Sequence, residues 1–247
     1  MKILLLILTF TLSLFAAKLS ITSNDGYKLY GWLEKPKDVK ESLGVIVFAH
    51  QFGADHTIWD DLASKFNDKG YATLSVDLRG HGKSIMQKNK ENKVTIDLRV
   101  DKIKQALNKS YKDVGFDNIP KDLSAWIDLL EEDDEINIDE LYLFGSSLGA
   151  GTLIPLLNSY EVKALVAISC GRLEALAEMS DMALSTSMSK MLFIASDNDP
   201  LGDSSRTIDY AKKAIFGTAL VVSSDGHGNT ILPLVEDYIF SFIKNTK

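Results

Sequence analysis

The chain has 247 residues, of which 45% are hydrophobic and 25% charged, a composition typical of a folded globular protein rather than a disordered one. The formal net charge of −7 argues against a general nucleic-acid binder, because that affinity depends on cationic contacts to phosphate. The single cysteine, Cys170, excludes an internal disulfide framework, and the length suits one α/β domain or two small ones.

The N-terminus has the features of a secretory signal peptide. Lys2 precedes an apolar run that ends in Ala16 and Ala17. A run of about 15 apolar residues suits a signal-peptide core and is shorter than the ~20 residues that a membrane-spanning helix needs. We therefore expect residues 1–17 to be a signal peptide, cleaved near its last alanines, and the protein to be exported to the periplasm or secreted. A retained N-terminal membrane anchor is the alternative.

Beyond this leader, strand and helix patterns alternate. Strands are expected over residues 18–23, 28–34, 44–50, 71–77, 141–144, 164–169, 191–196 and 219–223. Helical spacing of apolar residues predicts helices around residues 58–66, 120–130, 148–158 and 231–243, and Pro155 should kink or shorten the third of these. This alternation predicts a mostly parallel sheet of about eight strands with helices on both faces. Residues 18–247 then form one domain without a large cap.

A candidate nucleophile lies between a predicted strand and a predicted helix, where residues 145–149 read GSSLG. This G-x-S-x-G pattern is typical of a sharp turn that holds a serine hydroxyl clear of the sheet, beside a histidine and above a helix N-terminus. The turn matters because an ordinary serine hydroxyl is a poor nucleophile. The pattern therefore identifies Ser147.

The candidate base follows from chain order. Proteins with this elbow place the acid and then the histidine after the nucleophile. Of the four histidines, His50, His56 and His81 precede Ser147 and only His227 follows it, in a glycine-flanked loop after a strand. We expect His227 to be the base and His81 to brace a loop below the site.

The acid and the oxyanion donors are expected in neighbouring loops. The strand at 191–196 is followed by Asp197 and Asp199, of which Asp199 lies further into the loop, before a proline. We expect Asp199 to orient the histidine, with Asp197 as the alternative and Asp203 a more distant one. The backbone N–H groups of Leu148 and Phe52 are the expected donors to a developing oxyanion.

Residues 83–118 depart from the strand–helix alternation. Val100, Ile103 and Leu107 predict a short helix there, and residues 83–112 carry nine Lys or Arg against three acidic residues. This segment is either a solvated insertion or a flap over the site that attracts anionic substrates or an anionic membrane surface.

Taken together, these motifs resemble the α/β-hydrolases, and within them the small serine hydrolases related to dienelactone hydrolases and prolyl-oligopeptidase-type catalytic domains. The matching pieces are SNDG at 23–26, HQFG at 50–53, DLRGHGKS at 77–84, GSSLG at 145–149, DP at 199–200 and GHG at 226–228. They span almost all of the chain after the leader, in the expected order. Gln51 departs from the pattern, because a glycine is usual there, and dienelactone hydrolases proper have a cysteine in place of Ser147, which argues against that activity.

The resemblance implies hydrolysis by two-step acyl transfer. The expected substrate is a small molecule, a carboxylic ester of small or medium size. A peptidase or amidase with the same site residues is the first alternative, and a non-catalytic binding domain is the second. The histidines are scattered and no H-E-x-x-H motif occurs, so we expect no metal or cofactor. Cys170 is expected to be a buried structural thiol, and the oligomeric state stays open.

Overall fold

The structure is a computed structural model that describes residues 16–37, 39, 41–97, 99–202 and 204–246. Residues 1–15, which hold most of the predicted signal peptide, lie outside this part of the chain, as does Asp203. None of the helices within the described ranges is long and apolar enough to span a membrane.

Ten strands in the described residues form one sheet, in the order β10-β9-β8-β7-β3-β4-β2-β5-β6, with β1 paired to β2. The strands are β1 (Ala17–Thr22), β2 (Tyr27–Glu34), β3 (Val45–Ala49), β4 (Ala72–Asp77), β5 (Met86–Gln87), β6 (Lys90–Glu91), β7 (Leu141–Ser146), β8 (Ala164–Ile168), β9 (Lys190–Ser196) and β10 (Phe216–Val222). Six neighbouring strands pair in parallel, namely β4, β3, β7, β8, β9 and β10. The strands β1, β2, β5 and β6 form antiparallel pairs. The mostly parallel sheet of about eight longer strands is confirmed.

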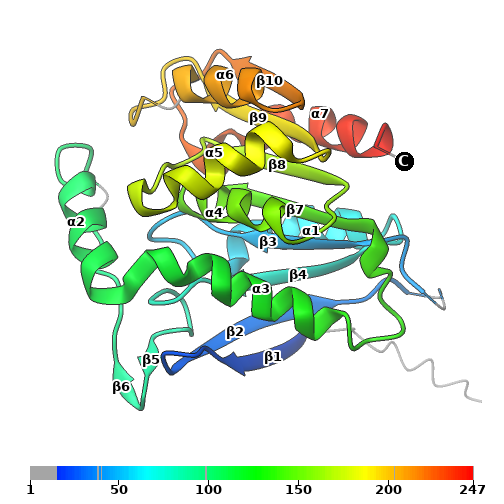
Figure 1. Cartoon of the computed structure of the whole chain (residues 1–247), viewed down its shortest axis with the longest axis horizontal. Helices are drawn as coiled ribbons and strands as arrows, with labels where there is room; N and C mark the ends of the chain where they lie inside the picture. Colours follow the sequence, from blue (N-terminus) through cyan, green and yellow to red (C-terminus); the bar gives the residue numbers. More distant parts are fainter. Residues whose placement is uncertain (1–15, 38, 40, 98, 203, 247) are drawn as a thin grey trace, which may run out of the picture.

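Helices cover both faces of the sheet, as expected (Figure 1). They are α1 (Asp60–Asn67), α2 (Ile103–Ser110), α3 (Ile119–Leu130), α4 (Leu148–Leu153), α5 (Ala177–Thr186), α6 (Ser204–Lys213) and α7 (Leu232–Lys244). The strand β3 is buried at all five positions because alternate side chains enter two separate cores. One core includes residues of α3, α4, α5 and α6, and the other includes residues of α1 and α7.

The helix that follows the elbow is short, as the proline predicts. The α-helical turn α4 ends at Leu153, and residues Ile154–Asn158 continue as a 3-10 helix that contains Pro155. Proline has no N–H to donate to the preceding turn, so the α-helix cannot continue through it unchanged. No large cap follows β8 in the described residues, where one 3-10 turn and α5 lead to β9.

A buried arginine joins the first hairpin to the helical layer. Arg79 donates to Asp122 of α3 from Nε at 2.6 Å and from Nη2 at 2.8 Å, and its Nη1 donates to Asp25 at 2.8 Å. Its side chain is 1% exposed. Removing one partner of such a buried ion pair typically costs about 3–5 kcal/mol, because the remaining charge is left uncompensated. Asp25 belongs to the SNDG motif and Arg79 to the DLRGHGKS motif, so their contact gives a structural reason for both motifs.

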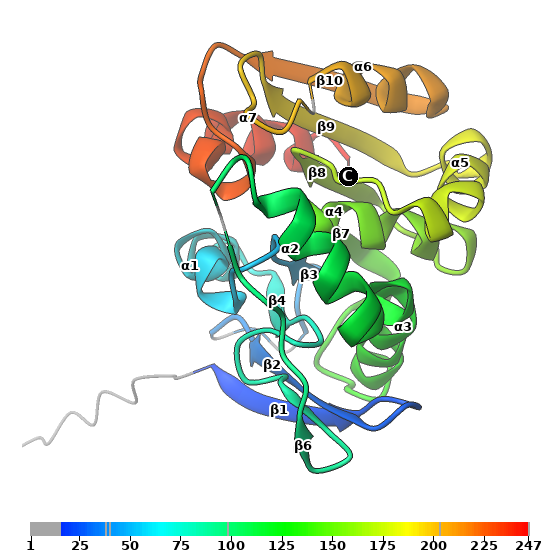
Figure 2. The same cartoon turned by 90° about the vertical axis from the view of Figure 1, so that its left-hand side faces the viewer.

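The insertion between β4 and α3 forms the two-residue strands β5 and β6 and then α2 (Figures 1 and 2). The predicted short helix exists, but it begins at Ile103, so Val100 lies in the loop before it. Figure 1 shows α2 beyond the end of the sheet, and Figure 2 shows it in front of the sheet when that end faces the viewer. The insertion therefore approaches the edge at which the parallel strands end.

Candidate active site

The turn after β7 holds Ser147 in a strained conformation, with φ 49° and ψ −108°. Such a backbone costs a non-glycine residue about 1–3 kcal/mol and persists only where its surroundings impose it. Here Ser147 N donates to Ile168 O at 2.8 Å, and Ser147 O accepts from Gly171 N at 2.9 Å. Gly149 is also required, because a Cβ there would lie 2.2 Å from the carbonyl oxygen of Ala49. The turn is therefore fixed against both neighbouring strands, β3 and β8.

The structure brings together the predicted nucleophile, base and first-choice acid. Ser147 Oγ lies 2.9 Å from His227 Nε2, and His227 Nδ1 lies 3.0 and 2.9 Å from the two carboxylate oxygens of Asp199. A proton on Nδ1 is donated to the carboxylate, and Nε2 then carries the lone pair that can accept the serine proton. This is the geometry that removal of a proton from Ser147 requires.

Of the candidate acids, Asp199 is the one placed at the histidine. Its side chain is fully buried and also accepts from Ser169 Oγ at 2.9 Å and Leu201 N at 2.8 Å. Burial raises the pKa of Asp199, but the hydrogen bonds from His227, Leu201 and Ser169 outweigh it and hold that pKa below its usual value. Asp197 instead accepts from Ser224 N at 3.0 Å, and Asp203 lies outside the described residues.

Ser169 is a site residue that sequence reasoning missed. It is buried at the end of β8 with φ 46°, and its Oγ donates to Asp199 while accepting from Gly228 N at 2.9 Å. One hydroxyl thus connects the acid to the loop that carries the histidine. No sequence signal distinguishes it, because a serine after a strand is common and its partners lie far away along the chain.

The two residues whose N–H groups are the predicted oxyanion donors border the same cavity as Ser147. Phe52 and Leu148 both line that cavity, and neither backbone N–H donates to another group of the described residues. The conformation of the Phe52 loop is set by His50, whose Nδ1 donates to Gln51 O at 2.8 Å and whose Nε2 accepts from Leu78 N at 3.0 Å. Burial lowers the pKa of His50 to about 3, so the ring stays neutral and keeps this pattern at ordinary pH.

Gln51, the departure from the family pattern, joins three segments of the site. Its Oε1 accepts from Ser146 Oγ at 2.8 Å and from Asn229 N at 2.9 Å. Gly228 makes this possible, because a Cβ at that residue would lie 2.0 Å from Gln51 Oε1. The side chain therefore connects the oxyanion loop to the nucleophile strand and to the histidine loop.

A family model described as serine aminopeptidase, S33, matches residues 40–196, more than half of the chain. The chain belongs to this family of α/β-hydrolases. The matched range includes Phe52 and Ser147 and ends before Asp199 and His227. No curated protein matches the sequence significantly.

Solved structures with a similar fold include esterases. Est1E from Butyrivibrio proteoclasticus superposes with a TM-score of 0.69 at 14% identity, over 94% of this chain and 99% of its own. The esterase domain of a Rhodothermus marinus protein gives 0.66 at 17% identity, over 94% and 99%. A dienelactone hydrolase from Anabaena variabilis gives 0.62 at 17% identity, over 92% and 99%. The identities are low, so these likenesses establish the α/β-hydrolase fold.

The cavity of this hydrolase has a volume of about 510 Å³ and is bounded by loops that follow β3, β7, β8, β9 and β10. The insertion supplies a further wall, through Val100, Ile103, Lys104 and Leu107. The segment that the sequence left open between solvated loop and flap thus lies directly against the site. The insertion lies where a lid over the site would lie, but it is inserted after strand β4 rather than after β8.

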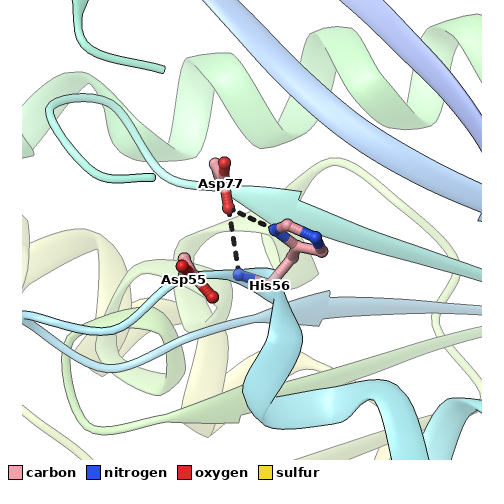
Figure 3. A group of neighbouring side chains, drawn as sticks. All are labelled: Asp55, His56 and Asp77. Atoms are coloured by element: carbon pink, nitrogen blue, oxygen red, sulfur yellow. Dashed lines mark hydrogen bonds and ion pairs between the residues drawn. The ribbon is translucent and has the colours of Figure 1, made fainter. Parts of the chain in front are cut away.

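A second His–Asp pair in the hydrolase lies outside this cavity (Figure 3). Asp77 accepts from His56 N at 2.9 Å, from His56 Nδ1 at 2.8 Å and from Lys83 N at 2.6 Å. The His56 ring stacks on Trp32 with centroids 3.3 Å apart, and neighbouring Asp55 caps the 3-10 turn by accepting from Thr57 N. These carboxylates are already bound to the protein's own donors, so the group fixes the loop after β3 against the end of β4.

The remaining sequence candidates are structural. His81 is buried below the oxyanion loop, where its Nδ1 lies 3.0 Å from Arg79 O and its ring packs edge-on against His50 and Phe52. Burial lowers the pKa of His81 to about 4. Cys170 is 1% exposed, as expected for a structural thiol.

Proposed function

We propose that this hydrolase cleaves carboxylic esters of small to medium size by a two-step acyl transfer at Ser147. The observation that carries the proposal is the 2.9 Å contact between Ser147 Oγ and a histidine held by a buried carboxylate, where both residues line a largely apolar cavity. Pockets of this size and lining accept small organic molecules, with a few polar groups to orient them.

In the first step, Ser147 Oγ attacks the ester carbonyl carbon while His227 Nε2 takes the serine proton. The oxygen of the tetrahedral intermediate, now negative, accepts hydrogen bonds from the Phe52 and Leu148 amides. Collapse breaks the carbon–oxygen bond to the alcohol, which leaves with the proton from His227. Water then attacks the acyl-enzyme, gives its proton to His227, and the acid departs as Ser147 regains that proton. Asp199 orients the imidazole and stabilises its charged form throughout.

The family description favours a peptidase as the second candidate. An aminopeptidase must bind the ammonium group of its substrate, which calls for carboxylates in the cavity. Among the described lining residues Asp225 is the only carboxylate, and it is accompanied by Lys104, Arg172 and Arg206. Cations repel an ammonium group, so the lining favours an ester over a peptide with a free N-terminus.

Parallel kinetics with 4-nitrophenyl butyrate and leucine 4-nitroanilide test this proposal. We expect the ester to be hydrolysed with a burst of product, and Ser147→Ala to abolish turnover while Ser185→Ala, an exposed-serine control, leaves it unchanged. Anilide cleavage at comparable efficiency moves the assignment to a peptidase. Absence of turnover for both substrates leaves a binding domain.

We also propose that the protein is exported, because Lys2 and the apolar run to Ala17 have signal-peptide features. N-terminal sequencing of the mature protein should begin near Lys18, in the periplasmic or culture fraction. An intact Met1 in the membrane fraction contradicts cleavage and indicates an anchor.

A further inference from the structure

We propose that the site selects esters that combine an apolar body with a negatively charged group such as a carboxylate. This inference rests on the proposed ester hydrolysis and adds the charge of the substrate. The observation behind it is that three cations line a cavity whose walls are mostly apolar.

The walls of the cavity suit a hydrocarbon body. Ile103 and Leu107 of α2 are partly buried against the main core, and they line the cavity together with Leu173 and Leu201. Phe52 contributes a further apolar surface beside the nucleophile. A chain or ring held there is removed from water, which favours binding in proportion to the apolar area that it buries. The apolar body of the substrate is therefore expected to lie under α2.

The charged residues of the lining have the opposite sign to the protein as a whole. Lys104, Arg172 and Arg206 outnumber the single carboxylate of Asp225 in the described lining, although the chain carries a formal charge of −7. A cleft with one sign of charge and low-dielectric walls concentrates ligands of the opposite sign. Cations gathered in this cavity of an acidic protein therefore favour an anionic substrate.

Arg172 is the cation best placed for a substrate carboxylate. It follows Gly171, whose N–H holds the nucleophile turn, and its side chain is 34% exposed. Its ion pairs with Asp181 and Glu174 are loose, at 3.6 and 3.9 Å, and Asp181 forms a 2.6 Å pair with Lys213. The side chain also interacts with Tyr210 through a hydrogen bond. A guanidinium group has five N–H donors, so Arg172 can point two parallel N–H groups toward a substrate carboxylate while it keeps its contact with Tyr210.

The insertion adds positive charge to the cavity through one lysine, Lys104, rather than through its total charge. Lys93, Arg99 and Lys109 form ion pairs with acidic neighbours at 2.5–2.6 Å. Lys104 lines the cavity and has no ion-pair partner within the described residues. Arg206 adds positive charge from α6 while its Nη1 donates to Cys170 O at 3.0 Å. Of the basic residues in segment 83–112, we therefore assign the attraction of anionic substrates to Lys104.

Two matched pairs of substrates test the proposal with the purified protein. On the acyl side, 4-nitrophenyl hexanoate is compared with the 4-nitrophenyl monoester of adipic acid. On the alcohol side, phenyl butyrate is compared with 3-carboxyphenyl butyrate. We expect the ratio of kcat/KM, anionic over neutral, to exceed one in at least one pair, and to fall as salt is raised from 0.05 to 0.5 M because salt screens the charges.

Charge-neutral variants locate the effect. Arg172→Gln and Lys104→Gln should each lower that ratio about three- to fivefold, mainly through KM, as expected for half-exposed ion pairs. Lys163→Gln, at the other end of β8, and Lys109→Gln, on α2 away from the cavity, should leave it within about 1.5-fold. Wild-type ratios at or below one in both pairs, or ratios that these variants leave unchanged, overturn the proposal. Absence of turnover for all four esters instead refutes the ester hydrolysis on which it rests.

Discussion

Gln51 should stabilise both the fold and the active geometry through one oxygen atom. Gln51→Met keeps the length of the side chain but removes the acceptor of Ser146 Oγ and Asn229 N. The loss of two neutral hydrogen bonds costs about 1 kcal/mol each, and a buried donor left without an acceptor adds to that cost. Ser146 is fully buried, so we expect Gln51→Met to lower the free energy of unfolding by about 2–3 kcal/mol.

Gln51→Glu separates the effect of the two hydrogen bonds from the effect of charge near the oxyanion. A carboxylate still accepts both hydrogen bonds, so stability should stay within about 1 kcal/mol of wild type. Its negative charge, next to the Phe52 amide, opposes the developing oxyanion. A repulsion of about 2 kcal/mol, reasonable at an effective dielectric constant near 20, lowers kcat about 30-fold.

Urea denaturation at pH 7 and steady-state hydrolysis of a neutral ester measure the two effects side by side. We expect Gln51→Met to lose stability and about tenfold in kcat, because the oxyanion and histidine loops lose their shared anchor. If Gln51→Met is as stable and active as wild type, the hydrogen bonds of Gln51 contribute neither to stability nor to catalysis. Gln51 is then a neutral departure from the family pattern. A fully active Gln51→Glu refutes the placement of the oxyanion beside this loop.

Three further predictions concern the acid, the histidine loop and the response to pH. Asp199→Asn should lower kcat by about 10³-fold or more and Asp197→Asn by less than about twofold in ester assays, and the reverse order would exchange their roles. Gly228→Ala should cost about 2–3 kcal/mol in urea denaturation, because φ is 60° there and a Cβ would meet Gln51 Oε1; an unchanged midpoint contradicts that contact. Burial lowers the pKa of His50 to about 3 and of His81 to about 4, below the value near 6.5 of an unfolded chain. The unfolded state therefore binds more protons than the folded state between about pH 4 and 6.5. The free energy of unfolding should decrease as the pH is lowered through that range, by up to about 1.4 kcal/mol per pH unit for each histidine. Urea denaturation at pH 4.5, 5.5 and 6.5 measures this slope, and a flat profile excludes neutral buried rings.

Ser147 and His227 could be predicted because each belongs to a local pattern and chain order leaves one histidine for the base. The preference for Asp199 over Asp197 depended on where β9 ends. The strand runs to Ser196, so Asp197 begins the turn and binds Ser224 N, while Asp199 lies at His227. A two-residue difference in a strand boundary decides between these acids, and a single sequence does not fix such a boundary closely.

Gln51 and Ser169 could not be assigned from the sequence because their partners are distant. The contact of Gln51 with Asn229 spans 178 residues, and that of Ser169 with Gly228 spans 59. The insertion shows the same limit. Its apolar spacing predicted a helix near Ile103, but only the tertiary structure places that helix against the site, and strands of two residues carry no recognisable periodicity.

Labelling with a fluorophosphonate probe tests the central claim most directly, because the probe reacts with a serine only where a base and oxyanion donors activate it. We predict stoichiometric labelling of the purified protein, located at Ser147 by peptide mass spectrometry and lost in Ser147→Ala. Labelling should become much slower in His227→Gln. An unlabelled folded protein, or a label on a different serine, contradicts the account.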